Sequence, residues 1–316
     1  MRKKVYILRY DPATPEGSYL QGFNIDLSAN ATILESLIKI KEEQDGTLTF
    51  RKSCRSAICG SCAVTVNGVA VLACNTQFKS VNWGEKDLVI EPLSNLPVIK
   101  DLVVNLHPFW NEIEKTLPWL EPKDEKEENI EKENIVCQED VNRIDESAGC
   151  IMCAACFGDC TIRETDDNFM GPAALAKSWR FVADVRDSLK HERLETLSED
   201  HNMWDCTRCN LCIDRCPKDV RPMDQIIKLR QEAVKKNIRN NKGARHVMAF
   251  KSDIKSSGKL NETTMPLKTV GVLRSLGMIP MALRMQMKGR VPFPIQKDIE
   301  GIEDVEKIYE VMGEDE

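Results

Sequence analysis

Two cysteine runs of identical spacing constrain this chain more than any other feature. Each run has the pattern C-x2-C-x2-C-x3-C. The first run consists of Cys150, Cys153, Cys156 and Cys160. The second run consists of Cys206, Cys209, Cys212 and Cys216. This spacing is typical of two-cluster iron–sulfur domains, in which the first three cysteines of a run bind one cluster and the fourth binds the other.

The spacing also predicts how the two runs share their ligands. Three closely spaced cysteines can cap one face of an iron–sulfur cube, whereas the fourth points away from it. One 4Fe-4S cluster is therefore expected on Cys150, Cys153, Cys156 and Cys216. The other cluster is expected on Cys206, Cys209, Cys212 and Cys160. Zinc is the alternative occupant, but paired runs of this kind seldom arise by chance.

A third set of cysteines precedes the two runs and has a different spacing. It follows C-x4-C-x2-C-x11-C and consists of Cys54, Cys59, Cys62 and Cys74. This is the plant-type ferredoxin pattern, which holds a 2Fe-2S cluster. The loop SCRSAICGSC is rich in small residues, so several backbone N–H groups can turn toward the thiolates. Zinc ribbons favour paired C-x2-4-C units and fit this loop poorly.

Composition agrees with metal or redox chemistry. The chain has 316 residues and 13 cysteines, and its start, MRKKVYILRYD, lacks the apolar stretch of a Sec-type signal peptide. Disulfide frameworks belong chiefly to small secreted domains. A net charge of −6 does not favour nucleic acid as a partner. The longest apolar run, 270–283, is too short to span a bilayer. Cys137 has no spaced partner and is expected to be an ordinary thiol.

Hydrophobic patterning predicts an α+β fold. Residues 1–120 are expected to form a plant-type ferredoxin (β-grasp) domain, with a capping box at Thr32–Glu35 and a hairpin turn at Asn67-Gly68. Residues 137–240 are expected to form an all-α bacterial-type ferredoxin domain, with an apolar helical stripe that starts after Gly171-Pro172 and reaches Val185. The remaining parts are a charged linker at 121–136 and a C-terminal extension at 241–316.

This order of domains resembles the iron–sulfur subunit of succinate dehydrogenase and fumarate reductase, over roughly residues 1–240. The resemblance includes the stretches Leu117-Pro118-Trp119-Leu120, Met170-Gly171-Pro172-Ala173-Ala174 and Ala183-Asp184-Val185-Arg186-Asp187. It implies a subunit without a catalytic site, which carries electrons between an FAD-containing flavoprotein subunit and a membrane anchor, and indirectly quinone. It also implies that the 2Fe-2S cluster lies nearest the flavin.

Departures from the family pattern concern the last cluster. Most members lack a cysteine at the position of Cys209, and their last cluster is 3Fe-4S on residues matching Cys160, Cys206 and Cys212. With Cys209 present, a second 4Fe-4S cluster is expected. Thr161, Glu164 and Thr207 replace the Pro, Trp and His found in quinone-linked members. These changes resemble the branch whose membrane-side partner is a cysteine-rich protein similar to a heterodisulfide reductase subunit.

The cysteine pattern is compatible with three functions. The first is the electron-transfer subunit of a succinate dehydrogenase or fumarate reductase. The second is an equivalent electron-transfer subunit of a thiol:fumarate reductase or a heterodisulfide-reductase-type complex. The third is a zinc-stabilised binding module, which would be colourless. The direction of electron flow stays open, because cluster potentials depend on hydrogen bonding and burial that a sequence does not reveal.

Two interpretations are open both for the location of the complex and for the role of the C-terminal extension. A peripheral membrane complex on the cytoplasmic side is expected, with co-export to the outer face as the alternative. The extension is interpreted as a dock for the membrane-side partner or as a solvated basic tail. Its basic residues face acidic protein or lipid head groups in the first case. They are Lys242, Arg245, Lys251, Lys255, Lys259, Arg274, Arg284, Lys288 and Arg290.

Overall fold

The computed structural model describes residues 2–15, 17–81, 87–123, 135–290 and 297–311. The chain divides into two compact units, Met1–Arg193 with Cys206–Lys228, and Leu194–Asp205 with Leu229–Glu316. All twelve cysteines of the three predicted cluster sites belong to the first unit. Most of the predicted charged linker, at 124–134, lies outside the described residues.

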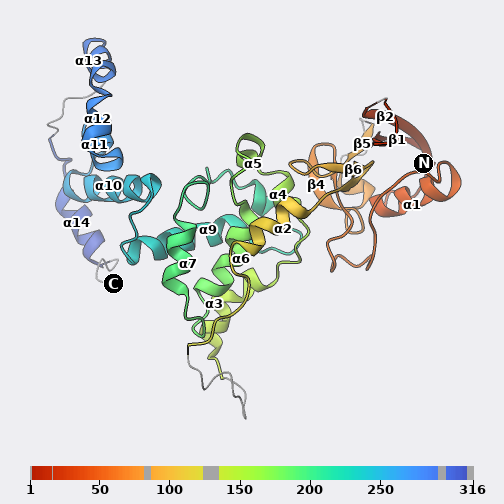
Figure 1. Ribbon diagram of the computed structural model, residues 1–316, viewed down its shortest axis with the longest axis horizontal. Helices are drawn as coiled ribbons and strands as arrows, with labels where there is room; N and C mark the ends of the chain where they lie inside the picture. The colour runs from red at the N-terminus through yellow and green to blue at the C-terminus, as the bar shows by residue number, and fades with distance from the viewer. Residues whose placement is uncertain (1, 16, 82–86, 124–134, 291–296, 312–316) are drawn as a thin grey trace. The chain divides into compact units, whose positions relative to one another are not determined.

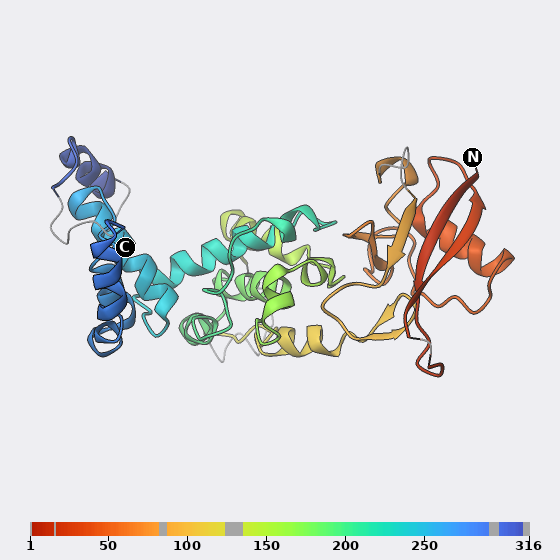
Figure 2. The same ribbon diagram turned by 90° about the horizontal axis from the view of Figure 1, so that it is seen from above.

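The first unit begins with a five-stranded mixed sheet in the order β2-β1-β5-β3-β4 (Figure 1). β1 pairs with β2 in antiparallel and with β5 in parallel orientation. The strands are β1 Arg2–Arg9, β2 Tyr19–Asp26, β3 Ala63–Val66, β4 Val69–Leu72 and β5 Leu88–Glu91. Helix α1, Ile33–Glu43, lies beside β1 and β2 and buries Ile33, Leu37 and Ile40 in the core (Figure 2). The predicted β-grasp arrangement is confirmed.

Local signals in this part of the sequence behave as predicted. The Thr32 side chain accepts a hydrogen bond from the backbone N–H of Glu35, whose carboxylate accepts one from the Thr32 N–H. This capping box begins α1. Asn67 and Gly68 both have positive φ, as a two-residue hairpin turn of this kind requires, and they join β3 to β4.

A short segment leads from the sheet to the helices. Strands β6, Val98–Lys100, and β7, Val103–Val104, form a separate two-stranded sheet, and α2, His107–Glu114, follows. Between β6 and β7, the buried Asp101 accepts a hydrogen bond from the guanidinium of Arg9 at 2.9 Å. The sequence patterns did not indicate these elements.

The cysteine runs lie among helices of the first unit. Helix α6 packs against α3, and it ends at Val182. Val185 lies beyond the helix and is 38% exposed, so its predicted place in the apolar stripe of this helix is wrong. The helices of this stretch are α3 Gln138–Ala148, α4 Ala155–Gly158, α5 Thr161–Thr165, α6 Pro172–Val182, α7 Lys190–Leu197, α8 Leu211–Asp214 and α9 Pro222–Lys235. The boundaries of the first unit, after Arg193 and after Lys228, fall within α7 and α9.

The second unit contains the C-terminal helices. Helix α10 begins at the N-cap Asn241, whose side chain accepts a hydrogen bond from the Gly243 N–H, and it packs against both α11 and α14. These helices are α10 Lys242–Ser257, α11 Met265–Val270, α12 Val272–Leu276, α13 Ile279–Met287 and α14 Ile302–Val311. Within the described ranges, every helix is too short or too polar to cross a bilayer.

Candidate iron–sulfur centres

The loop that carries the 2Fe-2S cysteines directs backbone donors at sulfur. Cys54 Sγ accepts hydrogen bonds from the N–H groups of Ser56, Ile58 and Cys59, at 3.3–3.4 Å. Cys74 Sγ accepts one from the Ala57 N–H at 3.3 Å. Such donors stabilise the negative charge of thiolate and sulfide, and they influence the reduction potential of a cluster. This donor set fits an iron–sulfur group.

The thiols of this loop differ in their environment. Hydrogen bonding to Ser61 lowers the pKa of the exposed Cys59 to about 6. Burial instead raises the pKa of Cys62 to about 12. A buried thiol must lose its proton when iron binds, so occupation of the site releases protons and depends on pH.

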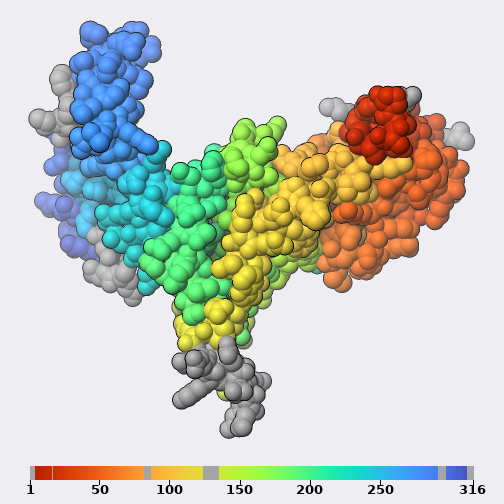
Figure 3. Space-filling model, in the orientation of Figure 1, coloured from red at the N-terminus to blue at the C-terminus, as the bar shows by residue number. Residues whose placement is uncertain are grey.

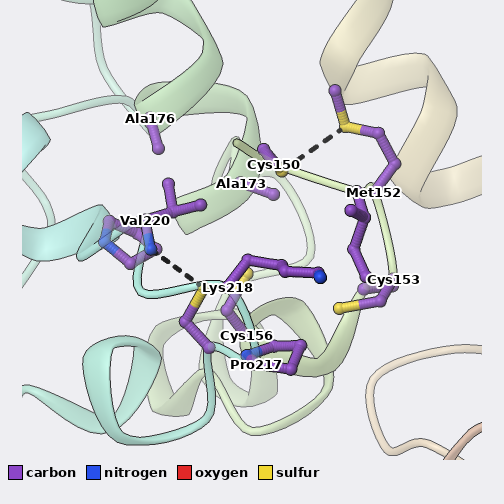
Figure 4. A pocket seen from close by; sticks show the side chains of 13 residues that line it. Cys150, Met152, Cys153, Cys156, Ala173, Ala176, Pro217, Lys218 and Val220 are labelled. Carbon is purple, nitrogen blue, oxygen red and sulfur yellow. Dashed lines mark hydrogen bonds between the residues drawn. The ribbon is translucent and has the colours of Figure 1, made fainter. Parts of the chain in front are cut away.

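The first run and the last cysteine of the second run line one cavity. Cys150, Cys153, Cys156 and Cys216 all contribute to its wall, and its volume is about 20 Å³ (Figure 4). Ala173 and Ala176 of α6 cover one side with small side chains. Burial raises the pKa of Cys150, Cys153 and Cys156, that of Cys153 to about 11. The structure therefore brings together the four cysteines that the crossed pattern assigns to one 4Fe-4S cluster.

The other crossed set combines a buried thiol, Cys212, with an exposed one, Cys209. Burial raises the pKa of Cys160, and the neighbouring Cys206 and Cys209 thiols raise it further. Burial raises the pKa of Cys212 to about 12. Cys209 is exposed, and its sulfur lies 4.0 Å from the Thr161 hydroxyl, which donates to it.

The two cysteine runs have the same backbone conformation. Met152 and Ala154 in the first run have positive φ, and so do Arg208 and Asn210 at the matching places in the second. A four-residue helix, α4 or α8, then precedes the fourth cysteine of each run. Left-handed residues of this kind turn successive N–H groups inward, which makes an anion-binding loop. The repeated spacing in the sequence therefore corresponds to a repeated structure.

Several polar contacts that sequence patterns did not indicate hold the cluster loops in place. Asp159 and Arg215 precede the fourth cysteines of the two runs, and they form an ion pair at 2.5 Å. Asp159 also accepts a hydrogen bond from the Ala70 N–H of β4 at 3.0 Å. The Asn95 amide donates to the carbonyl oxygens of Phe157, Gly158 and Cys160 at 2.8–3.1 Å. None of these residues belongs to a spaced motif.

Zinc sites have their own geometry, in which the ligands converge on a single ion. Among the described residues, no three His, Cys, Asp or Glu side chains are gathered closely enough to hold one ion.

Comparison with known proteins identifies the domains and the family. Residues 4–111 match the 2Fe-2S iron–sulfur cluster binding domain family, and residues 146–220 match the 4Fe-4S dicluster domain family. The chain is 37% identical over 237 residues to a mitochondrial succinate dehydrogenase [ubiquinone] iron–sulfur subunit of Oryza sativa, covering 73% of this chain and 83% of the relative. It belongs to the succinate dehydrogenase and fumarate reductase iron–sulfur subunits. Its role is electron transfer, and 2Fe-2S and 4Fe-4S clusters are its cofactors.

A second relative of this family matches more of the chain. The 8-methylmenaquinol:fumarate reductase iron–sulfur subunit of Wolinella succinogenes is 34% identical over 291 residues, which cover 88% of this chain and 89% of the relative. The remaining 12% of this chain, about 38 residues, lies outside the match. The C-terminal extension, 241–316, is longer than that, so the match continues into the extension. A chain of the Mycobacterium smegmatis Sdh1 complex shares the fold, with a TM-score of 0.65 and 23% identity, over 75% of this chain and 97% of that one.

Proposed function

We propose that this chain carries electrons along three clusters, between an FAD-containing flavoprotein subunit and a membrane-side partner. The observation that carries the proposal is the close approach of the 2Fe-2S loop to the first cubane site. A Cβ placed on Gly60, next to Cys59, would lie 2.8 Å from Cα and Cβ of Cys153. Electron tunnelling falls steeply with distance, so this contact favours direct transfer between the two clusters.

The proposed ligand sets are those of the crossed cysteine pattern. Cys54, Cys59, Cys62 and Cys74 hold the 2Fe-2S cluster; Cys150, Cys153, Cys156 and Cys216 hold the first 4Fe-4S cluster; Cys160, Cys206, Cys209 and Cys212 hold the last one. When bound, the clusters supply reversible one-electron chemistry. The protein directs N–H donors at the sulfurs and excludes water from the buried sites, and both features influence the potential.

The membrane-side partner in this proposal is a cysteine-rich, heterodisulfide-reductase-like subunit of a peripheral membrane complex. Support comes from the residues around the last cluster site, where Thr161 and Thr207 stand in place of the residues of quinone-linked relatives. The exposed Cys209 lies beside Thr161, so a fourth ligand is available on the side of the site that faces solvent in this chain.

Electron paramagnetic resonance (EPR) on the anaerobically purified complex of this chain with its flavoprotein tests the function. Succinate should reduce the 2Fe-2S cluster, and fumarate should reoxidise it, because the flavin site and the clusters exchange electrons. Dithionite reduction and iron and zinc counts on the same sample establish that the clusters are intact. If dithionite reduces the clusters but neither succinate nor fumarate changes their signals in a complex whose flavoprotein is active, the proposed function is wrong.

Replacing Cys209 tests the last cluster. In Cys209→Ser, the remaining ligands Cys160, Cys206 and Cys212 should hold a 3Fe-4S cluster, with an EPR signal in the oxidised state that the wild type lacks. Stability should change little, because Cys209 is exposed. Cys212→Ser is the matched comparison, since loss of the buried ligand should remove the whole cluster. An unchanged spectrum in Cys209→Ser, or a strong 3Fe-4S signal in fresh wild type, contradicts the 4Fe-4S assignment.

A further inference from the structure

The segment 265–290 in the second unit combines apolar and basic residues and has no acidic residue. It contains Lys268, Arg274, Arg284, Lys288 and Arg290, in a chain whose net charge is −6. Apart from the basic residues, only Thr269, Ser275 and Gln286 in this segment carry polar side chains. The other residues are Met, Leu, Ile, Val, Ala, Gly and Pro.

The structure buries Met265 of α11 but leaves the apolar side chains of α12 and α13 uncovered. Helices α12 and α13 bury no residue at all. Leu273 is 88% exposed and Met287 80% exposed, and other apolar residues between them are also exposed. Such a continuous apolar surface marks a binding site for another protein or for a membrane.

Charge is segregated within the second unit. In Figure 1, α11, α12 and α13 follow one another away from α10, and α14 lies on the other side of α10. The same segment appears in blue in Figure 3. Helix α14 carries the acidic residues Glu303, Asp304, Glu306 and Glu310. Lys268 pairs with Asp253 of α10, whereas within the described ranges no carboxylate pairs with Arg274, Arg284, Lys288 or Arg290. The unit thus presents a basic, apolar side and an acidic side.

We infer that the segment 265–290 binds directly to the surface of a bilayer that contains anionic lipids. Leu, Ile and Met side chains enter the boundary between head groups and acyl chains, and the basic side chains meet lipid phosphates. Gly271 and Gly277 separate the short helices α11, α12 and α13, so the segment contains no continuous helix long enough to span a bilayer. The segment offers cationic donors and no carboxylate, so its charge complements an anionic surface such as lipid phosphates.

This attachment is separate from the proposed electron-transfer role, since no cluster ligand lies in the segment. It gives the electron-transfer subunit its own contact with the membrane, in addition to any anchor subunit. The acidic α14 helix, on the other side of α10, would stay away from the anionic lipid surface and so fix the orientation of the unit.

Co-sedimentation of the full-length, cluster-loaded chain with lipid vesicles tests this inference. Binding to vesicles of 30% phosphatidylglycerol in phosphatidylcholine should be at least tenfold tighter than to phosphatidylcholine alone, and should weaken as salt rises from about 0.1 to 0.5 M. The variant Arg274→Gln/Arg284→Gln/Lys288→Gln/Arg290→Gln should lose at least tenfold in affinity, since each basic residue near the surface contributes about fivefold. Leu273→Gln/Leu283→Gln should also weaken binding, because apolar insertion is lost.

The matched control is Lys235→Gln/Lys236→Gln, which removes two exposed lysines of the same unit outside the segment. It should bind vesicles like the wild type. All variants alter exposed side chains, so their helix content and cluster absorbance should be unchanged, and both are measured. Equal binding to neutral and anionic vesicles, or full binding by the quadruple variant, would overturn the inference. The inference would also be overturned if the segment mediated self-association or bound an anchor subunit and the chain did not bind vesicles.

Discussion

Cys216→Ser is expected to remove the cluster that the first cysteine run holds, although Cys216 belongs to the second run. Its sulfur shares one cavity with Cys150, Cys153 and Cys156 and accepts a hydrogen bond from the Val220 N–H at 3.3 Å. A serine hydroxyl is a harder and poorer ligand for an iron–sulfur cluster than a thiolate. We therefore expect a loss of about four iron atoms per chain, the content of one such cluster.

The measurement for Cys216→Ser is iron content together with EPR of the dithionite-reduced protein. The signal of the cluster on Cys206, Cys209 and Cys212 should persist. Cys137→Ser is the control: this exposed thiol donates a hydrogen bond to Asp140 at 3.1 Å and lines no cluster site, so its iron count should match the wild type. Loss of only the Cys206 cluster in Cys216→Ser would show that the crossed assignment is wrong.

The features that the sequence predicted well are formed by residues that lie close together in the chain. The capping box at Thr32–Glu35 and the hairpin at Asn67-Gly68 are formed by residues next to one another, so local sequence determines them. Cysteine spacing is informative for a similar reason, because the size of a cluster limits which intervals can hold it. The two domain families and their order were therefore predictable from the sequence.

What the sequence did not indicate depends on tertiary contacts. Asp159 and Arg215 are 56 residues apart, and neither residue type identifies its partner. Asn95 is an ordinary turn residue in the sequence, yet it holds the carbonyl of Cys160. The end of α6 before Val185 instead coincides with local ion pairs that the apolar pattern does not reveal, because Asp184 accepts hydrogen bonds from Arg180 and Arg186 just after the helix. These ion pairs hold the pKa of Asp184 well below its usual range, although burial opposes them.

Gly60→Ala is expected to disturb two clusters with one methyl group. Gly60 has a φ of +73°, a conformation that costs a residue with a side chain about 1–2 kcal/mol. The added Cβ would also lie 2.8 Å from Cα of Cys153, where backbone and not a flexible side chain must give way. Overpacking adds about 1–3 kcal/mol. We expect a total loss of about 2–5 kcal/mol in the free energy of unfolding.

Gly68→Ala separates these two causes. Gly68 has a similar φ of +77°, but a Cβ there would meet nothing within 4 Å. It should therefore show the strain alone, with about 1–2 kcal/mol of destabilisation and normal clusters. In Gly60→Ala, displacement of Cys153 should also slow electron transfer from the 2Fe-2S cluster to the first cubane, as measured by freeze-quench EPR after rapid reduction. Thermal unfolding of both variants gives the stability comparison. Equal destabilisation and equal transfer rates in the two variants would mean that the approach of Gly60 to Cys153 contributes neither to packing nor to the electron path.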